Sequence, residues 1–419
     1  MNAATGTTVE NLDDDSQRNA LSIVLAGFAF FIQFRVTIPY LFFQSHPAYG
    51  TLTGAVGIVV FVAITALMLL FETPERLDVD LPKGIRSLFL FLAWSGISIC
   101  WTLAASRTVA TMYWLLICLE ATYALIMIRY TGIDRGVKSF IYGWYYGGTA
   151  VAACALITQP RAEGGSRLGD PLLLHPNLLG NTCAVSLLCG SYVLLTSKRR
   201  SVVLVSAGIQ ALALILTFSK TAMLALLIAY AFLFVRLRLT WRQRTIAVAS
   251  FLTVLLASYQ KISEYLINYL VQQQGGEALD TFTGRTVLWA VVVGMLPERL
   301  WFGHGFLSFR DVGPQIFEGI PVVHAHNELL MLLFTAGIIG TLLGYGVYVC
   351  LFMNMRRLNK SGETVQRMTA QLGIAFLIYH LIRSITEASQ FELLMPSALI
   401  VVLFIYAGHH LAKPNDRRA

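Results

Sequence analysis

The 419-residue chain is 56% hydrophobic and only 13% charged, with a mean hydropathy of +0.65. Soluble globular domains average about 45–50% apolar and about 25% charged residues, so the composition excludes an ordinary soluble domain and predicts a polytopic membrane protein. The formal net charge of +8 comes without a long basic run. Its spread over short segments between apolar stretches argues against a nucleic-acid-binding protein and fits membrane topology.

The apolar stretches are long enough to cross a bilayer many times. One crossing needs about 20 apolar residues, and we predict an all-α polytopic membrane protein with about twelve transmembrane helices in one domain, residues 1–419. The predicted helices cover residues 20–42, 50–71, 85–101, 108–128, 138–158, 173–196, 201–218, 220–235, 245–262, 326–353, 368–386 and 391–411. The polar segment before the first helix has no basic n-region and no cleavage site, so we expect that helix to remain as an anchor.

The basic residues predict which side of the membrane each connection occupies. Of the 31 lysines and arginines, 21 lie in segments that the alternation of twelve helices places on one side. Cytoplasmic connections are enriched in Lys and Arg, so this side is cytoplasmic and holds both termini. The large segment between the ninth and tenth helices, residues 263–325, then faces the outer side. We expect short helices within it.

Ten basic residues lie outside those cytoplasmic segments and have no topological role. They are Arg35, Arg107, Arg161, Arg167, Lys220, Lys261, Arg285, Arg299, Arg310 and Arg383. Arg35 lies in the outer part of the first helix. An arginine inside a bilayer is costly and normally faces a partner or a water-filled cavity, although its side chain could instead extend to the outer headgroups.

Two outward connections before the large segment combine basic residues with turn residues. Residues 159–171, QPRAEGGSRLGDP, contain Arg167 and lead into a His-Pro-Asn tripeptide at residues 175–177. Proline is accepted in a first helical turn, so the tripeptide reads either as a capped helix entry or as part of a site. Lys220 stands in a tight turn between two helices. Arg167 is either a solvated charge or part of a site, and the Lys220 side chain either belongs to a site or extends to the membrane interface.

The large outer segment holds titratable groups and turn residues in one region. Arg285 precedes an amphipathic stretch, residues 287–295, that could lie flat on the outer leaflet as an interfacial helix. Residues 301–306, WFGHGF, predict a tight turn with aromatic anchors. The HAHNE motif, residues 324–328, stands at the start of the tenth helix, where free backbone N–H groups suit an anion.

His324 and His326 raise the question of a metal site. Two histidines on one helix usually bind metal at i,i+4 spacing, and Glu328 is the only further ligand nearby, so no metal is predicted. A neutral histidine suits general-base catalysis on a hydroxyl, because its ordinary pKa is about 6.5. Arginine side chains fit a phosphate or diphosphate. Glu387 could pair with an arginine of the site, orient the histidine or pair with Arg383.

Five sequence blocks occur in order between residues 167 and 340. They are RLGDPLLLHPNLLGN, TFSKTAMLALL, TGRTVLW, FGHGFLSF and HAHNELLMLLFTAGIIG. With the twelve predicted helices and the large outer segment, they resemble the bacterial O-antigen ligase and O-antigen polymerase superfamily. The resemblance implies glycan transfer without metal or cofactor at the periplasmic face of the bacterial inner membrane. The donor would be a glycan on undecaprenyl diphosphate. The acceptor would be a sugar hydroxyl of lipid A core for a ligase, which is favoured, or a growing chain for a polymerase.

The resemblance also implies roles for individual residues. His326 would be the base that activates the acceptor hydroxyl, and Arg285 and Arg167 would hold the diphosphate. Lys220 stands where the superfamily more often has arginine, so it would act as a point charge. The resemblance says little about Arg35, His324 and Glu387. Together with His175 and Asn177, they are candidate accessory residues of the site.

A transporter or flippase is the alternative from a different class, since it would explain Arg35 within the membrane. Transporters commonly consist of repeated halves with broken helices near the midplane. The sequence shows no internal repeat at a fixed period, and its unusual residues gather at the outer rim, so an enzyme is favoured. The expected partners are the lipid-linked donor, the glycan acceptor and membrane lipid, with no nucleic acid.

Overall fold

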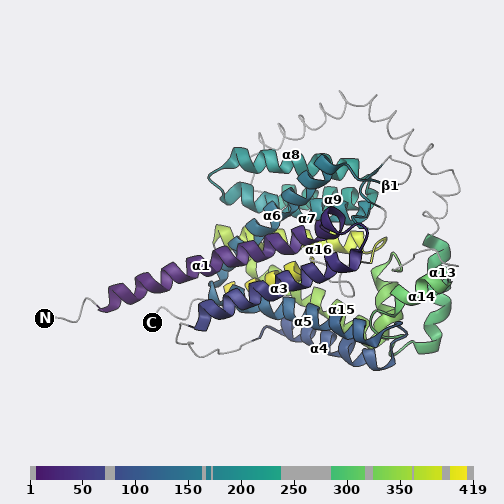
Figure 1. The fold of residues 1–419 in the computed structure, drawn as a ribbon. Coiled ribbons are helices and arrows are strands. Elements are labelled where there is room, and N and C mark those ends of the chain that lie inside the picture. The colour runs from purple at the N-terminus through teal and green to yellow at the C-terminus, as the bar shows by residue number, and fades with distance from the viewer. Residues whose placement is uncertain are drawn as a thin grey trace, which may run out of the picture.

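The computed structural model of the chain is built almost entirely of helices (Figure 1). It describes residues 6–70, 81–162, 167–170, 173–236, 285–316, 324–360, 363–388 and 397–412. Two short strands, β1 Arg161–Ala162 and β2 Arg167–Leu168, pair antiparallel in the connection between two of the helices. The predicted fold class, an all-α polytopic membrane protein, is confirmed.

The long helices follow the predicted order along the chain. They are α1 Gly6–Phe34, α3 Pro47–Leu70, α4 Lys83–Ser98, α5 Arg107–Tyr130, α6 Ile133–Thr158, α7 Pro176–Thr196, α8 Arg200–Leu216, α9 Lys220–Arg236, α15 Glu328–Leu358, α16 Thr364–Arg383 and α17 Ser397–Leu411. Shorter elements are η1 Arg35–Thr37, α2 Ile38–Phe42, η2 Ile99–Trp101, α13 Arg285–Met295, η3 Leu296–Arg299 and α14 Ser308–Ile316. The last three lie in the large outer segment, where short helices were predicted.

Within the described residues, seven helical segments are long and apolar enough to cross a membrane. They are Ser16–Phe42, Leu52–Leu69, Lys83–Trp101, Arg107–Tyr130, Ile133–Thr158, Pro176–Thr196 and Glu328–Leu358. The helices α8, α9, α16 and α17 correspond to four further predicted crossings. The predicted helix at residues 245–262 lies outside the described residues, so the count of twelve stays a prediction.

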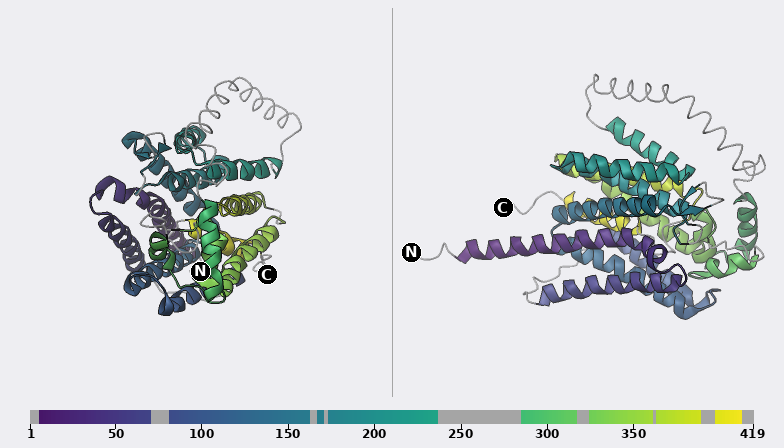
Figure 2. Two further views of the ribbon diagram at one scale, coloured as in Figure 1. Left: turned by 90° about the vertical axis from the view of Figure 1, so that its right-hand side faces the viewer. Right: turned by 45° about the horizontal axis from the view of Figure 1, so that its top comes forward.

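The long helices run roughly side by side in one bundle (Figure 1). The helices α8 and α9 lie on one flank and α3 and α4 on the opposite flank, while α13 and α14 cover one end (Figures 1 and 2). The first helix begins at the other end of the bundle. The helix α16 contacts α7, α9 and α15. This arrangement places the short helices of the outer segment at the end where the candidate site lies.

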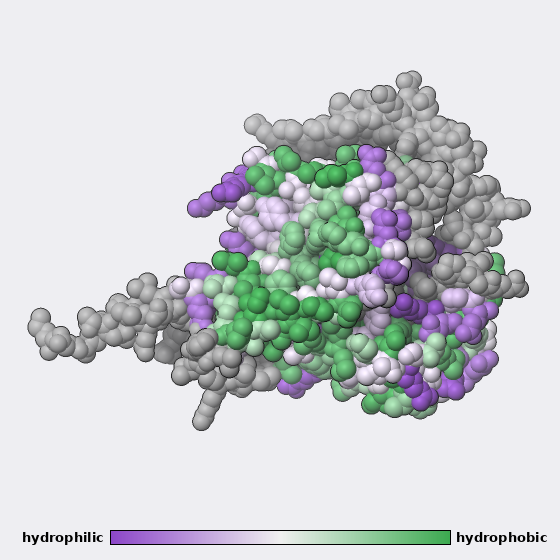
Figure 3. Space-filling view, viewed as in Figure 1, coloured by the Kyte–Doolittle hydropathy of each residue, from purple (hydrophilic) through white to green (hydrophobic). Residues whose placement is uncertain are grey.

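The outer surface of the bundle is apolar, as a lipid environment requires. Hydrophobic residues gather over the middle of the visible face and hydrophilic residues lie toward its two ends (Figure 3). The helix α3 exposes Leu52, Val56, Val59 and Leu67, each with more than half of its surface accessible. In water such a face would favour aggregation, whereas in a bilayer it contacts acyl chains.

The packing of α1 on α6 depends on two glycines spaced four residues apart. A Cβ atom at Gly143 would meet the backbone of Ala26, and one at Gly147 would lie 2.7 Å from the Phe30 carbonyl oxygen. Small residues at this spacing let two membrane helices approach closely, and dispersion contacts then stabilise the pair. The first helix, whose sequence contributes only topology to the superfamily resemblance, is thus packed tightly against the bundle.

The helix α15 is broken at Gly337, which has a φ of 66° and a ψ of −171°. The break frees backbone groups that an unbroken helix would pair internally. The Ile338 N–H donates to Leu300 O at 2.9 Å, and the Ile339 N–H lies 3.4 Å from Trp301 O. These acceptors belong to a turn over residues 300–305, which overlaps the turn predicted at residues 301–306. It replaces the missing helical acceptors, as buried backbone groups require.

The carbonyl groups before the break are satisfied in the same way. Phe334 O accepts from His304 N at 2.6 Å, Thr335 O from Gly305 N at 2.9 Å, and Ala336 O from Trp94 Nε1 at 2.8 Å. The 300–305 turn is inserted between the outer part of α15, residues 328–336, and its membrane-spanning part. The sequence alone predicted an uninterrupted helix here.

Replacing Gly337 by alanine should destabilise the protein. The residue has a left-handed backbone, and an added Cβ atom would lie 2.4 Å from Trp301 O. A non-glycine residue in a sparsely populated backbone region costs about 1–3 kcal/mol before any clash is counted. Thermal unfolding in detergent measures the effect, with Gly208→Ala as the control because nothing lies within 4 Å of a Cβ atom there. Equal melting temperatures for the two variants would contradict this account.

Candidate active site

The candidate site forms where the start of α15 meets the end of α16. Asn327 is the N-cap of α15, and its side chain accepts from the Leu330 N–H at 3.0 Å. Its Nδ2 donates to Ile385 O at 3.0 Å, and the Glu328 N–H donates to Ser384 O at 3.0 Å. These bonds tie the HAHNE motif to the turn that follows α16, so the two segments share one position at the end of the bundle.

His326 directly precedes this cap and has a left-handed backbone, with a φ of 49°. Its N–H lies 3.3 Å from Nδ1 of His324, and the two rings are 4.0 Å apart in an edge contact. Left-handed non-glycine residues are uncommon and cluster at sites whose geometry is imposed by their surroundings. The conformation turns the histidine away from the helix that it precedes.

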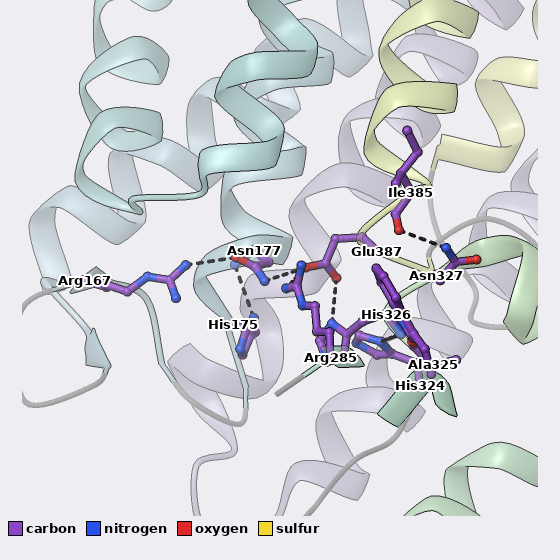
Figure 4. Close-up of polar contacts among 11 residues, drawn as sticks. Arg167, His175, Asn177, Arg285, His324, Ala325, His326, Asn327, Ile385 and Glu387 are labelled. Atoms are coloured by element: carbon purple, nitrogen blue, oxygen red, sulfur yellow. Dashed lines mark hydrogen bonds and ion pairs between the residues drawn. The ribbon is translucent and has the colours of Figure 1, made fainter. Parts of the chain in front are cut away.

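Glu387 is the centre of the polar cluster (Figure 4). Its side chain is 4% exposed, and Oε1 accepts hydrogen bonds from Arg285 Nη2 at 2.9 Å and Asn177 Nδ2 at 2.7 Å. Its Oε2 lies 3.4 Å from His326 Nδ1, which is an ion-pair distance but long for a hydrogen bond. One buried carboxylate thus joins residues from α7, α13 and the start of α15.

Arg167 joins the same network from the connection before α7. Its Nη2 donates to Asn177 Oδ1 at 2.9 Å, and its Nε donates to Thr217 O at 2.9 Å. The Asn177 amide therefore links Arg167 on one side to Glu387 on the other. The three residues that the resemblance implied, Arg167, Arg285 and His326, lie in one connected polar cluster.

Two other expected residues lie at the edge of this cluster. His175 is the N-cap of α7, and its Nδ1 accepts from the Asn177 N–H at 3.2 Å. Pro176 occupies the first turn, so the tripeptide is a capped helix entry and also supplies Asn177 to the network. Lys220 begins α9 close enough to Arg167 for the two charges to interact.

Arg35 is held away from the cluster by a buried partner. Its guanidinium forms a two-point ion pair with Glu120, in which Nη2 and Oε2 are 3.2 Å apart. The two side chains are 9% and 5% exposed. Among the contacts of the described residues, none joins Arg35 to Glu387 or His326. The ion pair with Glu120 therefore agrees with the expectation that an intramembrane arginine faces a partner. It does not agree with the alternative that the Arg35 side chain extends to the outer headgroups.

The protonation states in the cluster follow from burial and neighbouring charge. The pKa of His324 is lowered to about 3, chiefly by burial and also by the nearby His326 and Arg383, against the opposing effect of Glu387. Burial alone would raise the pKa of Glu387, but the neighbouring His326 and Arg383 hold that pKa well below its ordinary value. At neutral pH, His324 is neutral and Glu387 is ionised.

The central part of the chain matches a known family. Residues 203–345 match the family model for O-antigen ligase. The chain carries an O-antigen ligase domain. The match confirms the superfamily predicted from sequence, and no curated protein matches the chain. Lys220, Arg285 and His326 fall inside the O-antigen ligase domain, whereas Arg167 and Glu387 come from outside it and complete the cluster.

The O-antigen ligase domain and its surroundings also place three potential metal ligands together. His324, His326 and Glu387 each offer an atom, and these atoms lie within 4.8 Å of one another. Sequence spacing had suggested Glu328 as the only third ligand, but Glu328 instead lies 3.0 Å from His380 and accepts from Tyr348. One oxygen of Glu387 also accepts a hydrogen bond from Arg285 at 2.9 Å. That no metal binds here stays a prediction.

The role of Glu387 was the least predictable part of the site. Its sequence position is compatible with pairing to an arginine of the site, with orienting the histidine and with pairing to Arg383. The described contacts pair Glu387 with Arg285 and His326 instead of Arg383. The available signal was an acidic residue four positions after Arg383, in a turn between two predicted helices. Its partners lie 102 and 210 residues earlier in the chain, at Arg285 and Asn177.

Proposed function

We propose that the chain is an O-antigen ligase-type glycosyltransferase. It would move a glycan from undecaprenyl diphosphate to a sugar hydroxyl of lipid A core, without a metal ion or cofactor. The O-antigen ligase match supports a ligase or polymerase of this superfamily. The observation that carries the proposal is the Glu387 carboxylate, which holds a candidate base, His326, beside a candidate phosphate ligand, Arg285.

The base in this mechanism is Nε2 of His326. Nδ1 faces the ionised Glu387 carboxylate at 3.4 Å, so the ring carries its proton on Nδ1 and leaves Nε2 as the acceptor. As the acceptor oxygen attacks the anomeric carbon, its proton passes to Nε2. The resulting imidazolium is stabilised by the carboxylate. Glu387 thus positions the ring and compensates the charge that develops on it.

The arginines act on the leaving group. The bond between the anomeric carbon and the phosphate oxygen breaks, and undecaprenyl diphosphate departs with the electron pair. Arg285 and Arg167 offer planar groups that match phosphate oxygens in two-point contacts, and Lys220 adds a point charge. Donors fixed before the reaction stabilise developing charge without reorganisation, and this is usually the largest contribution to catalysis.

The membrane arrangement that we propose follows from the basic residues. The chain is one membrane domain of the bacterial inner membrane, residues 1–419, with both termini cytoplasmic and the 263–325 segment and the site periplasmic. Trp301 and Phe302, which are 60% and 55% exposed, and the exposed Val287 and Val293 of α13 form an apolar rim near the cluster. Such a rim suits contact with outer-leaflet lipid and with the polyprenyl tail.

Acceptor dependence tests the reaction. Purified protein should transfer glycan from the lipid-linked donor only when lipid A core is added, because a ligase needs that hydroxyl to accept the glycan. The measurement is a gel shift of the lipid A core, with donor alone as the control. Lengthening of the donor glycan without core would instead assign a polymerase, which shares the superfamily and the same candidate base and arginines. No product under either condition would refute the glycosyltransferase proposal.

A further inference from the structure

Arg383, the last residue of α16, is a buried arginine that the proposed mechanism does not use. It is 4% exposed, and its Nε and Nη1 have no hydrogen-bond partner among the described residues. Buried charges are nearly always paired, because an unpaired guanidinium loses its hydration without compensation. A structural role alone does not explain why these donors stay unsatisfied.

The surroundings of Arg383 connect it to the candidate active site. The Glu387 N–H donates to Arg383 O at 3.0 Å, so Arg383 lies one helical turn before the central carboxylate of the cluster. The Glu387 oxygens are directed to other groups, Oε1 to Arg285 and Asn177 and Oε2 toward His326. The carboxylate therefore leaves the Arg383 donors free for a further acceptor.

A second unsatisfied donor lies in the same turn. The Thr386 N–H donates to Arg383 O at 3.1 Å, and the Thr386 hydroxyl is buried without a partner among the described residues. Unsatisfied buried polar groups in a folded protein call for a specific explanation. Several N–H and O–H donors gathered at one place match a ligand rich in acceptor oxygens.

The balance of charge defines the ligand further. Arg167, Arg285 and Arg383 bring three permanent positive charges, and Glu387 is the one carboxylate hydrogen-bonded to Arg285 and Asn177. The excess of positive charge matches a diphosphate ester, which carries a negative charge on each phosphate, better than a phospholipid with a single phosphodiester. Arginine forks also fit phosphate oxygens in geometry.

We propose that Arg383 is a further ligand of the donor's diphosphate, with Nε and Nη1 donating to the oxygens of one phosphate. This inference rests on the proposed function, because it assigns the same site a lipid-linked diphosphate. The diphosphate would satisfy the buried guanidinium when it binds. In the unliganded protein, Nε and Nη1 have no hydrogen-bond acceptor among the described residues, and the diphosphate would supply one.

Pyrophosphate binding to the purified full chain tests the proposal. Arg383→Gln should weaken pyrophosphate affinity about tenfold or more, the range expected for one charge-assisted contact. The same variant should keep or raise the melting temperature without pyrophosphate, because it removes buried N–H donors that have no acceptor. The matched control is Arg310→Gln, an exposed arginine of the outer segment that contacts Tyr113. Neither the pyrophosphate affinity nor the melting temperature of the control should change.

Several results would overturn the proposal. They are unchanged pyrophosphate affinity in Arg383→Gln, a lower melting temperature with unchanged affinity, and absence of pyrophosphate binding by the unmodified protein. If the glutamine variant does not fold, Arg383→Lys keeps the charge without the fork and should bind about threefold more weakly. Unchanged affinity in that variant would count equally against a ligand role.

The second arm of the experiment separates two sources of phosphate. Phosphatidylglycerol in mixed micelles replaces pyrophosphate, and stabilisation that depends on Arg383 only with this lipid would assign a headgroup and contradict the diphosphate. Pyrophosphate binding does not require glycan transfer. A protein that shows Arg383-dependent pyrophosphate binding but no glycan transfer would refute the proposed function and not this inference. Glycan transfer together with unchanged pyrophosphate binding in Arg383→Gln would refute this inference and not the proposed function.

Discussion

His326→Ala should lower the rate of glycan transfer by about 10²–10⁴-fold, the contribution that a positioned general base typically makes. The loss should appear in kcat, because the side chain acts on the acceptor proton and not on the diphosphate. Melting temperature should change little, since His326 Nδ1 makes only a long contact with Glu387. The measurement is initial transfer rate at saturating donor and core.

The control for this variant is His46→Ala. His46 is an exposed histidine in the turn between α2 and α3, and its ring contacts Tyr49. It should transfer glycan at the unmodified rate, which would exclude a general effect of removing a histidine from an outward turn. A His326→Ala protein that is folded and keeps more than about a tenth of the activity would be incompatible with the base proposed here.

Glu387→Ala should cause the second large effect, and it should act on stability and activity together. The change leaves Arg285 without its carboxylate and removes the acceptor of the Asn177 amide. Removing one member of a buried ion pair costs about 3–5 kcal/mol, and because Arg285 is 17% exposed the lower end of this range applies. Thermal unfolding and transfer rate, measured on the same preparation, report the two effects.

Glu387→Gln removes the negative charge of the side chain while keeping its size and shape. Glutamine can still accept from Arg285, so melting temperature should fall less than in the alanine variant, but it cannot stabilise the imidazolium of His326. We expect the transfer rate to fall by at least about tenfold while the donor KM changes less. Glu298→Gln is the matched control, an exposed glutamate of the outer segment. An unmodified rate in Glu387→Gln would restrict Glu387 to a structural role.

Much of the fold and part of the site could be predicted from local sequence. Apolar length and basic residues predict helices at the right places, and short blocks such as HAHNE predict where His326 lies relative to a helix start. These features depend on residues that are close in the chain. The resemblance then supplied Arg167 and Arg285, which the structure brings into one cluster with His326.

The remaining features depend on contacts between distant segments. The TAGIIG block reads as apolar helix, and only the backbone groups of the 300–305 turn make a break at Gly337 acceptable. An arginine and a glutamate four residues apart, Arg383 and Glu387, read as an ordinary local ion pair. The contacts of Glu387 with Arg285 and His326 became visible only when α13 and α15 were placed around it.

The bonds at the start of α15 also set an order of assembly. The Glu328 N–H and the Asn327 amide are satisfied by Ser384 and Ile385, which are synthesised more than fifty residues later. His326 therefore emerges from the ribosome long before the groups that fix its backbone. A nascent chain inserted as far as α15 has His326 without the Glu387 carboxylate and without its anchoring carbonyls. Under the proposed mechanism, transfer must therefore wait until α16 and the turn that follows it are in place.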